Sequence, residues 1–274
     1  MTVAEAIRAA TAKLEATSDT ARLDAELLMA HALEVTRSDM LLWHMAKPAP
    51  GTYSDLITRR ETCEPVAHIT GLQEFYGRNF AVTPDTLIPR GDSETLIDAS
   101  LELAPGAQHV LDLGTGTGAL FVTALLELVD ANGVATDKSL KALKVVEQNA
   151  RALGLDEACA RFELRDWTIE GWADGLGRFD LILCNPPYVE DAAPLEADVR
   201  KFEPPSALFS GPEGLDDYRI LIPQLRGLMR AKAVAILEIG ATQGPAVTQI
   251  AQDQGFSVTM RKDLAGRPRC LVLR

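Results

Sequence analysis

The sequence is poor in the residues that metal sites and disulfide frameworks require. Its 274 residues include only four cysteines and four histidines. The cysteines form no C-x-x-C pair and have no histidine at ligand spacing, and the histidines form no H-x-x-x-H pattern. Structural zinc and a set of disulfides are therefore not predicted, and nothing in the sequence indicates a metal.

Long apolar runs are also missing. No segment approaches the roughly 20 consecutive apolar residues that a membrane-spanning helix needs. The first residues, "MTVAEAIRAATAKLEA", mix acidic and basic side chains, so they predict neither a secretory signal nor a membrane anchor. We expect a cytoplasmic protein without a membrane partner.

Basic residues are the third shortage, because 27 Lys and Arg face 39 Asp and Glu, a formal net charge of −12. Nucleic-acid binding relies on Lys and Arg side chains that neutralise phosphates. The balance therefore disfavours direct nucleic-acid binding and favours a small molecule or a basic protein surface as the partner.

Residues 1–70 have the pattern of a small helical bundle. Thr2 and Glu5 in "TVAE" have the spacing of a capping box. In a second run, "ARLDAELLMAHALEV", one helix face is predicted to carry Leu23, Leu27, Ala30 and His31. Both a packing role and a partner-binding role fit such a domain.

Residues 71–90 change character and predict a connector. Aromatic and β-branched residues flank the triplet 77–79, Gly-Arg-Asn, as in a short hairpin. Asp92 is then predicted to cap a helix that runs to about Leu103, with Glu94 in its first turn.

Residues 91–274 alternate strands with helices, which predicts a parallel sheet covered by helices on both faces. Two final strands, separated by the turn-rich "KDLAGRPR", predict an antiparallel hairpin. We therefore expect a doubly wound α/β domain with a mostly parallel seven-stranded sheet. The predicted strands are residues 109–113, 133–136, 160–164, 179–183 and 233–239, then "FSVTMR" and "CLVLR".

A glycine loop follows the first of these strands, in "HVLDLGTGTGAL". Gly114, Gly116 and Gly118 let the backbone turn sharply and approach a ligand where the next helix begins. Asp137 closes the next strand, where a carboxylate can accept hydrogen bonds from ribose hydroxyls. The spacing is G-x-G-x-G and not the G-x-G-x-x-G of dinucleotide binders.

Asp166 and Trp167 follow the third strand. The carboxylate is placed to receive an adenine amino group, and the indole to cover the ring. An ordinary core tryptophan is the alternative for Trp167 alone. The loop and Asp137 at the neighbouring strand ends favour the binding role.

The fourth strand ends in "CNPPY". Pro186 and Pro187 have carbonyls but no N–H, and the side chain of Asn185 adds an oxygen, so the segment offers acceptors to a ligand. Two acceptors hold both hydrogens of an NH₂ group and aim its out-of-plane electrons at an electrophile, while Tyr188 covers the flat group. A turn that merely ends the strand is the alternative for the prolines alone.

With these motifs in place, the chain resembles the S-adenosylmethionine-dependent methyltransferases that modify NH₂ groups. More closely, it resembles the peptide chain release factor glutamine methyltransferases, the PrmC or HemK family. The match extends through "RRETCEPVAHITGLQEFYGRNFAV", "LIPRGDSETLID", "EGLDDYRILI" and "LEIGATQG". The resemblance implies a Rossmann-like fold, methylation of the glutamine amide in the Gly-Gly-Gln loop of class 1 release factors, and a helical domain that helps to hold that protein.

The donor and substrate sites are assigned by position within these motifs. Residues predicted to bind S-adenosylmethionine are Gly114, Thr115, Gly116, Thr117, Gly118, Asp137, Asp166, Trp167 and Asn185. Residues predicted to hold the glutamine amide are Asn185, Pro186, Pro187 and Tyr188, and the predicted catalytic residues among them are Asn185, Pro186 and Tyr188. Arg90 and Glu94 lie in the matching "IPR" segment, where pairing with each other is one explanation.

Two other functions remain open. A methyltransferase for the exocyclic amine of a nucleic-acid base needs the same acceptors, although the acidic charge and the lack of a basic or aromatic stripe count against it. A scaffold that binds a translation factor without catalysis is the second. The intact glycine loop and the acceptor segment argue against that reading.

Overall fold

The computed structural model describes residues 1–274, except for the side chain of Glu157. The chain divides into two compact units. One comprises Met1–Leu72 and Leu195–Phe202, and the other comprises Gln73–Pro194 and Glu203–Arg274. Each unit has its own apolar core. The partner-binding role of the first unit stays a prediction.

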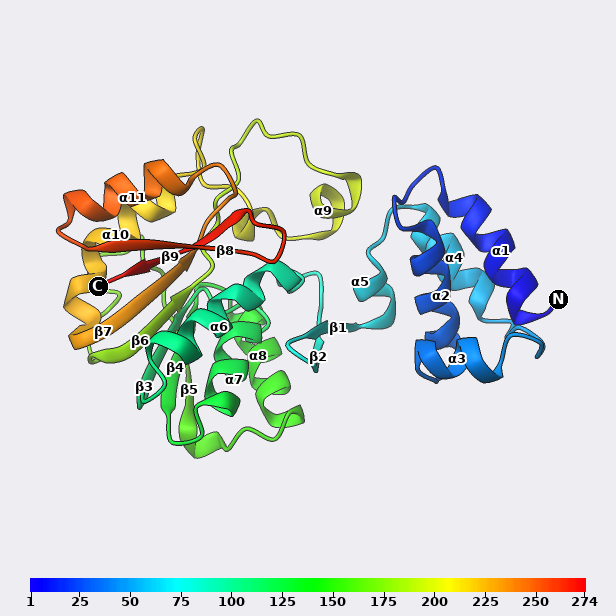
Figure 1. The fold of residues 1–274 in the computed structure, drawn as a ribbon, viewed down its shortest axis with the longest axis horizontal. Coiled ribbons are helices and arrows are strands. Elements are labelled where there is room, and N and C mark those ends of the chain that lie inside the picture. The colour runs from blue at the N-terminus through cyan, green and yellow to red at the C-terminus, as the bar shows by residue number, and fades with distance from the viewer. The chain divides into compact units, whose positions relative to one another are not determined.

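The first unit is helical, and its second helix packs against the first, third, fourth and fifth (Figure 1). Its helices are α1 (Val3–Leu14), α2 (Ala21–Ala32), α3 (Arg37–Trp43), α4 (Tyr53–Glu61), α5 (Val66–Thr70) and the short α9 (Ala197–Phe202). The predicted capping box is confirmed: the Thr2 hydroxyl accepts from the Glu5 N–H, and the Glu5 carboxylate accepts from the Thr2 N–H.

The predicted side of α2 is mostly exposed. Leu23 and Leu27 are 41% and 36% exposed and His31 is exposed, so Ala30 is the one residue of the four that is buried. The core side of the helix carries Leu28, which is fully buried, and Asp24, which accepts a hydrogen bond of 2.7 Å from the buried Arg60 guanidinium.

The hairpin consists of β1 (Leu72–Phe75) and β2 (Arg78–Ala81). Its turn is Tyr76-Gly77 and not the predicted triplet 77–79, since β2 already begins at Arg78. Tyr76 and Gly77 make the turn with positive φ angles of 50° and 72°. The Tyr76 N–H donates to the Glu94 carboxylate at 2.8 Å, which holds this unusual tyrosine conformation.

Asp92 does not cap the next helix. A 3₁₀ turn, η1 (Gly91–Ser93), precedes α6 (Glu94–Leu103), and the Asp92 carboxylate instead accepts from Arg267 at 3.0 Å and Arg269 at 2.8 Å. Two guanidinium groups outcompete backbone N–H groups for this side chain. Glu94 lies in the first turn of the helix, as predicted.

The second unit is built on a seven-stranded sheet in the order β5-β4-β3-β6-β7-β9-β8. Strands β3 to β7 are parallel, and β9 runs antiparallel to β7 and β8. The strands are β3 (His109–Leu113), β4 (Asn132–Asp137), β5 (Ala160–Leu164), β6 (Phe179–Cys184), β7 (Met229–Glu238), β8 (Val258–Lys262) and β9 (Pro268–Leu273). This confirms the predicted doubly wound, mostly parallel seven-stranded sheet with its antiparallel C-terminal hairpin.

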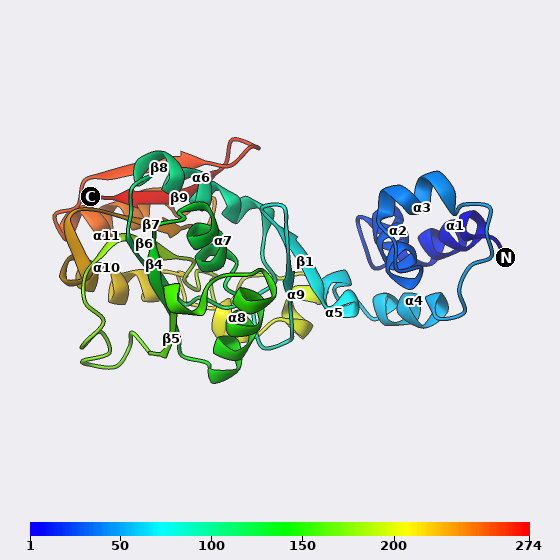
Figure 2. The same cartoon turned by 90° about the horizontal axis from the view of Figure 1, so that it is seen from below.

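Helices cover both faces of the sheet (Figure 2). One core joins α6, α7 and α8 to strand residues such as Val110, and the other joins α10 and α11 to residues such as Leu111. The alternation along β3 follows from the period of two in a strand. Beyond α6, these helices are α7 (Ala119–Glu127), α8 (Leu140–Ala152), α10 (Asp216–Leu228) and α11 (Gly244–Asp253), with 3₁₀ turns η2 (Glu157–Cys159) and η3 (Pro205–Ala207).

The strand order reverses between β3 and β6. On one side of β3 lie β4 and β5, and on its other side lie β6 and β7. Crevices for ligands form at such switch points, outside the carboxyl ends of the strands. Within residues 1–274 as described, no helix combines the length and the apolar character needed to cross a membrane.

Candidate active site

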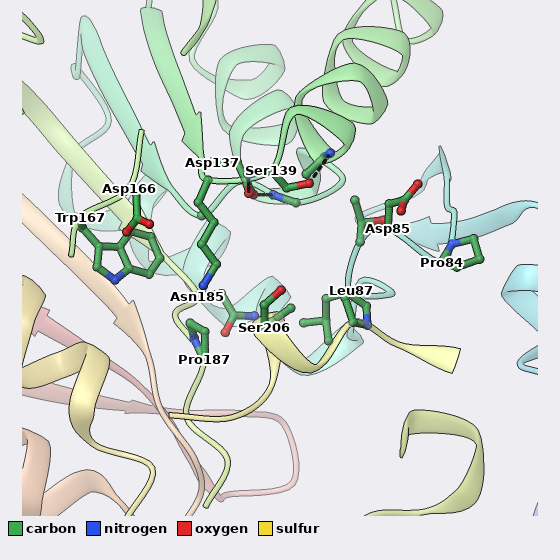
Figure 3. A pocket seen from close by; sticks show the side chains of 17 residues that line it. Pro84, Asp85, Leu87, Asp137, Ser139, Asp166, Trp167, Asn185, Pro187 and Ser206 are labelled. Atoms are coloured by element: carbon green, nitrogen blue, oxygen red, sulfur yellow. Dashed lines mark hydrogen bonds between the residues drawn. The ribbon is translucent and has the colours of Figure 1, made fainter. Parts of the chain in front are cut away.

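A cavity of about 300 Å³ lies at the carboxyl ends of β3, β4, β5 and β6. Its size is at the lower end of the range for small-molecule sites. Figure 3 shows Asp166 and Trp167 on one side of it and Asp85 and Leu87 on the other. The lining residues are Pro84, Asp85, Thr86, Leu87, Gly114, Gly116, Asp137, Lys138, Ser139, Ala142, Asp166, Trp167, Asn185, Pro187, Pro204, Ser206 and Ala207.

The glycine loop comes close to the cavity because it has no side chains there. Gly114 and Gly116 have φ of 72° and 55°, a region that other residues rarely adopt. A Cβ at Gly114 would stand 3.0 Å from the Trp167 ring. A Cβ at Gly116 would meet nothing within 4 Å, so open space lies beside that residue.

Asp137 is held by the backbone of the same loop. Its two carboxylate oxygens accept hydrogen bonds from the Gly116 N–H at 3.0 Å and the Ser139 N–H at 2.9 Å. Burial raises the pKa of this carboxyl, and the two N–H groups and the nearby Lys138 ammonium oppose that rise. Each oxygen keeps further acceptor capacity, which suits the hydroxyls of a ribose.

Asp166 and Trp167 both line the cavity, next to each other. Thr168 donates its N–H and its hydroxyl to one Asp166 oxygen, at 2.9 and 2.7 Å, and these bonds lower the pKa of that carboxyl. Trp167 is only 9% exposed, and its indole N–H donates to Asp217 at 2.8 Å. The indole is therefore both part of the core and one wall of the cavity.

Asn185 follows the last residue of β6 and lines the cavity with Pro187. Among the residues that the structure describes, no hydrogen bond engages the Asn185 side chain or the carbonyls of Pro186 and Pro187. Neither proline has an N–H. The segment is therefore a ledge of free acceptors, and below we call residues 185–187 the acceptor ledge.

Tyr188 is fixed at three points beside this ledge. Its N–H donates to the Leu208 carbonyl at 3.1 Å, its carbonyl accepts from the Gln243 amide at 2.9 Å, and its hydroxyl donates to Glu238 at 3.2 Å. Burial raises the pKa of both Tyr188 and Glu238. Tyr188 and Pro186 do not line the cavity, so their substrate roles stay predictions.

Three predicted donor residues also lie off the cavity wall: Thr115, Thr117 and Gly118. The Thr117 carbonyl accepts from the Asn149 amide at 2.8 Å, which ties the loop to α8. A Cβ at Gly118 would stand 2.4 Å from Val146 of the same helix. In this structure the two residues serve the packing of the loop.

The outer wall was not predicted from the sequence. It consists of Pro84–Leu87 and of Pro204, Ser206 and Ala207, in segments whose only signal is a high proline content. The suggested pair of Arg90 with Glu94 is wrong. Arg90 pairs with Glu203, and Glu94 accepts from the Tyr76 N–H.

The chain is similar to known proteins along its whole length. Residues 5–71 match the model of the PrmC N-terminal domain, and residues 93–202 match that of the methyltransferase small domain. The release factor glutamine methyltransferase of Cereibacter sphaeroides is 41% identical, over 100% of this chain and 99% of its own length. That of Moorella thermoacetica is 40% identical, over 99% and 98%.

Solved structures with the same fold are more distant in sequence. The hMettl16 catalytic domain, solved with an RNA hairpin, matches with a TM-score of 0.55 at 15% identity, over 80% of this chain and 81% of that one. A methyltransferase from Pyrococcus furiosus matches with a TM-score of 0.52 at 16% identity, over 72% and 89%. These likenesses show the fold alone.

Proposed function

The chain belongs to the family of release factor glutamine methyltransferases, and from this premise we propose its donor and its substrate. The donor is S-adenosylmethionine. The substrate is the side-chain amide nitrogen of the glutamine in the Gly-Gly-Gln motif of class 1 peptide chain release factors. The proposed location is the cytoplasm, and the proposed role of the helical residues 1–70 is to help to hold the substrate protein.

The charge of the cavity supports this donor. Its lining carries three carboxylates, Asp85, Asp137 and Asp166, against one ammonium, Lys138, and Asp85 also pairs with Lys141 outside the lining. The remaining net negative charge suits S-adenosylmethionine, whose sulfonium and ammonium groups outweigh its one carboxylate. The glycine loop and Asp137 would hold the ribose end, and Asp166 with Trp167 would hold the adenine. When bound, the sulfonium supplies an electrophilic methyl group.

The observation that carries the substrate assignment is the acceptor ledge. An amide nitrogen is a poor nucleophile because its lone pair is delocalised into the carbonyl. The Asn185 side-chain oxygen and the Pro186 carbonyl would accept its two hydrogens and aim the lone pair at the methyl group. As the N–C bond forms and the S–C bond breaks, positive charge grows on the nitrogen, and these fixed acceptors stabilise it. The product nitrogen then releases its proton to water.

The decisive experiment is mass spectrometry of a release factor incubated with this protein and S-adenosylmethionine. We expect a gain of one methyl group on the glutamine of the Gly-Gly-Gln motif, and none on a release factor in which that glutamine is alanine. Parallel incubations offer the methyl-labelled donor to DNA and RNA. Label in nucleic acid alone would establish the base methyltransferase instead, and a protein that binds no donor would be a scaffold.

A further inference from the structure

The outer wall of the cavity has an unusual construction. Its two segments, Pro84–Leu87 and Pro204–Ala207, are over a hundred residues apart in the sequence and belong to no strand of the sheet. Figure 3 shows Leu87 and Ser206 from the two segments at the same cavity. Two prolines in the second segment, Pro204 and Pro205, have no N–H to donate. No strand pairing therefore joins the segments.

Glu203 joins them instead. One oxygen of its carboxylate accepts from the Ile88 N–H at 3.0 Å, and the other accepts from the Arg90 guanidinium. Among the residues that the structure describes, these are the only hydrogen bonds between segments 84–90 and 203–207. Glu203 precedes Pro204 in the chain, and Ile88 follows Leu87. The carboxylate thus acts one residue from the cavity wall on both sides.

Burial makes the hydrogen bonds of Glu203 costly to break. Glu203 and Ile88 are each only 4% exposed, so a lost bond would leave a buried N–H or a buried charge without a partner. Arg90 is 39% exposed at its side chain, so water screens its part of the pair to some degree. The first segment also has an ion pair of Asp85 with Lys141, which we call its exposed anchor. The side chain of Asp85 is 38% exposed and that of Lys141 is 73% exposed.

We propose that Glu203 is a positioning residue of the donor site. Its carboxylate keeps the two outer segments together. This contact lowers the rate at which the donor, and S-adenosylhomocysteine after the methyl group is transferred, dissociate from the cavity. The inference rests on the proposed function, because it takes the cavity to be the donor site. Arg90, whose role the sequence left open, is the partner that holds the buried carboxylate in place.

The test is the dissociation rate of S-adenosylhomocysteine from the full chain, measured by stopped-flow with tryptophan fluorescence, since Trp167 lines the cavity. Glu203→Gln keeps the shape but replaces one acceptor oxygen by an NH₂ group. We expect about tenfold faster dissociation, the effect of one lost charge-assisted hydrogen bond. Arg90→Lys keeps the charge without the guanidinium fork, so its rate should lie between those of the wild type and Glu203→Gln. It also serves if Glu203→Gln does not fold.

Two controls separate positioning from general stability. Lys141→Ala removes the exposed anchor of the same wall segment, and its dissociation rate should stay within about twofold of the wild type. Asp24→Asn breaks the buried pair with Arg60 in the helical unit and should lower the melting temperature without changing dissociation.

The outcomes are distinguishable. If Glu203→Gln or Arg90→Lys melts lower, as Asp24→Asn does, but releases S-adenosylhomocysteine at the wild-type rate, the positioning role is overturned. If the wild type itself binds no S-adenosylhomocysteine, the proposed donor is wrong, and with it the proposed function. Wild-type binding with unchanged release in the variants removes only the inference about Glu203.

Discussion

Two parts of the cavity differ in their hydrogen bonding. In the proposed donor half, the carboxylates of Asp137 and Asp166 already accept hydrogen bonds from N–H and hydroxyl groups of the protein. In the proposed substrate half, formed by the acceptor ledge, of which Asn185 and Pro187 line the cavity, the oxygens have no partner within the described chain. We infer that the first half is fixed in advance to supply affinity, and that the second is left unsatisfied to act on the group that reacts.

The largest expected effect comes from Asn185→Ala. Removal of the side-chain oxygen would take away one of the two acceptors that we propose to stabilise charge on the reacting nitrogen. We expect turnover to fall by roughly a hundredfold or more, with the affinity for the donor mostly retained. Steady-state kinetics with a release factor and calorimetry with S-adenosylmethionine measure the two quantities. Normal turnover in this variant would refute the role of the ledge.

Asp137→Ala should have the opposite effect: a lower affinity for the donor with little change in turnover. The variant would lose the proposed charge-assisted hydrogen bond to the ribose, so donor binding should weaken by about 1 to 3 kcal/mol. Turnover at saturating donor should change much less, because the ledge is intact. Titration calorimetry provides the affinity, and an unchanged value would show that the carboxylate does not touch the ribose. Glu147→Ala of α8, which lies outside the cavity lining, is the matched carboxylate control.

Behind the glycine loop, β3 carries a buried carboxyl that the proposed mechanism does not use. Asp112 of β3 is 2% exposed, one of its oxygens has no partner among the described residues, and burial raises its pKa from 3.8 to about 7, with the charge of Asp137 adding to the rise. Between these values the folded state binds more protons than the unfolded state. Stability contributed by this group is therefore lost as the pH rises through this window.

Asp112→Asn removes that dependence. One pKa unit corresponds to about 1.4 kcal/mol, but relaxation and water penetration reduce the effect at buried sites, so we expect a gain of about 1 to 2 kcal/mol above pH 7. The gain should shrink as the pH falls through the window and vanish only at about pH 3 or below, under both pKa values, where both states of the wild type are protonated. Urea unfolding at several pH values measures it. A gain that does not depend on pH would point to a packing effect instead.

Much of the fold could be predicted because the sheet is buried on both faces. Central strands of this kind read as continuous apolar runs, and the predicted bounds of β3 agree with the structure. The predicted bounds of the edge strand β5 also agree, although none of its residues is fully buried. β7 begins at Met229, four residues before the predicted start. The prediction missed this part because residues 230–232 are exposed and include the charged Arg230 and Lys232. Contacts between distant residues were missed, as with Asp92 and its two arginines.

The site shows the same division. Residues at strand ends could be located because parallel strands bring their carboxyl ends to one edge, and the cavity is lined by Gly114, Asp137, Asp166 and Asn185. The outer wall could not be predicted, because its segments have no periodic pattern and depend on Glu203. The hydrogen bonds of Gln243 and Gln224 were missed for a similar reason, since nothing local marks a side chain that holds a distant backbone group.

The smallest effects are expected from these two glutamines, one behind each half of the cavity. The Gln243 amide donates to the carbonyls of Tyr188 at 2.9 Å and Gly214 at 3.1 Å and accepts from the Gly240 N–H at 3.0 Å. Gln243→Ala frees the Tyr188 carbonyl and loosens the end of the acceptor ledge. We expect turnover to fall by about three- to tenfold, the size of one lost hydrogen bond, with donor affinity unchanged.

Gln224 is the matched residue of the donor half, because its amide donates to the Trp167 carbonyl at 3.3 Å and accepts from the Trp172 indole at 2.5 Å. Gln224→Ala should weaken donor binding by a similar factor and leave turnover at saturating donor unchanged. Measuring both constants for both variants tests the division between affinity and rate, since each substitution removes the same chemical group. If both variants altered the same constant, the two halves would not be functionally separate.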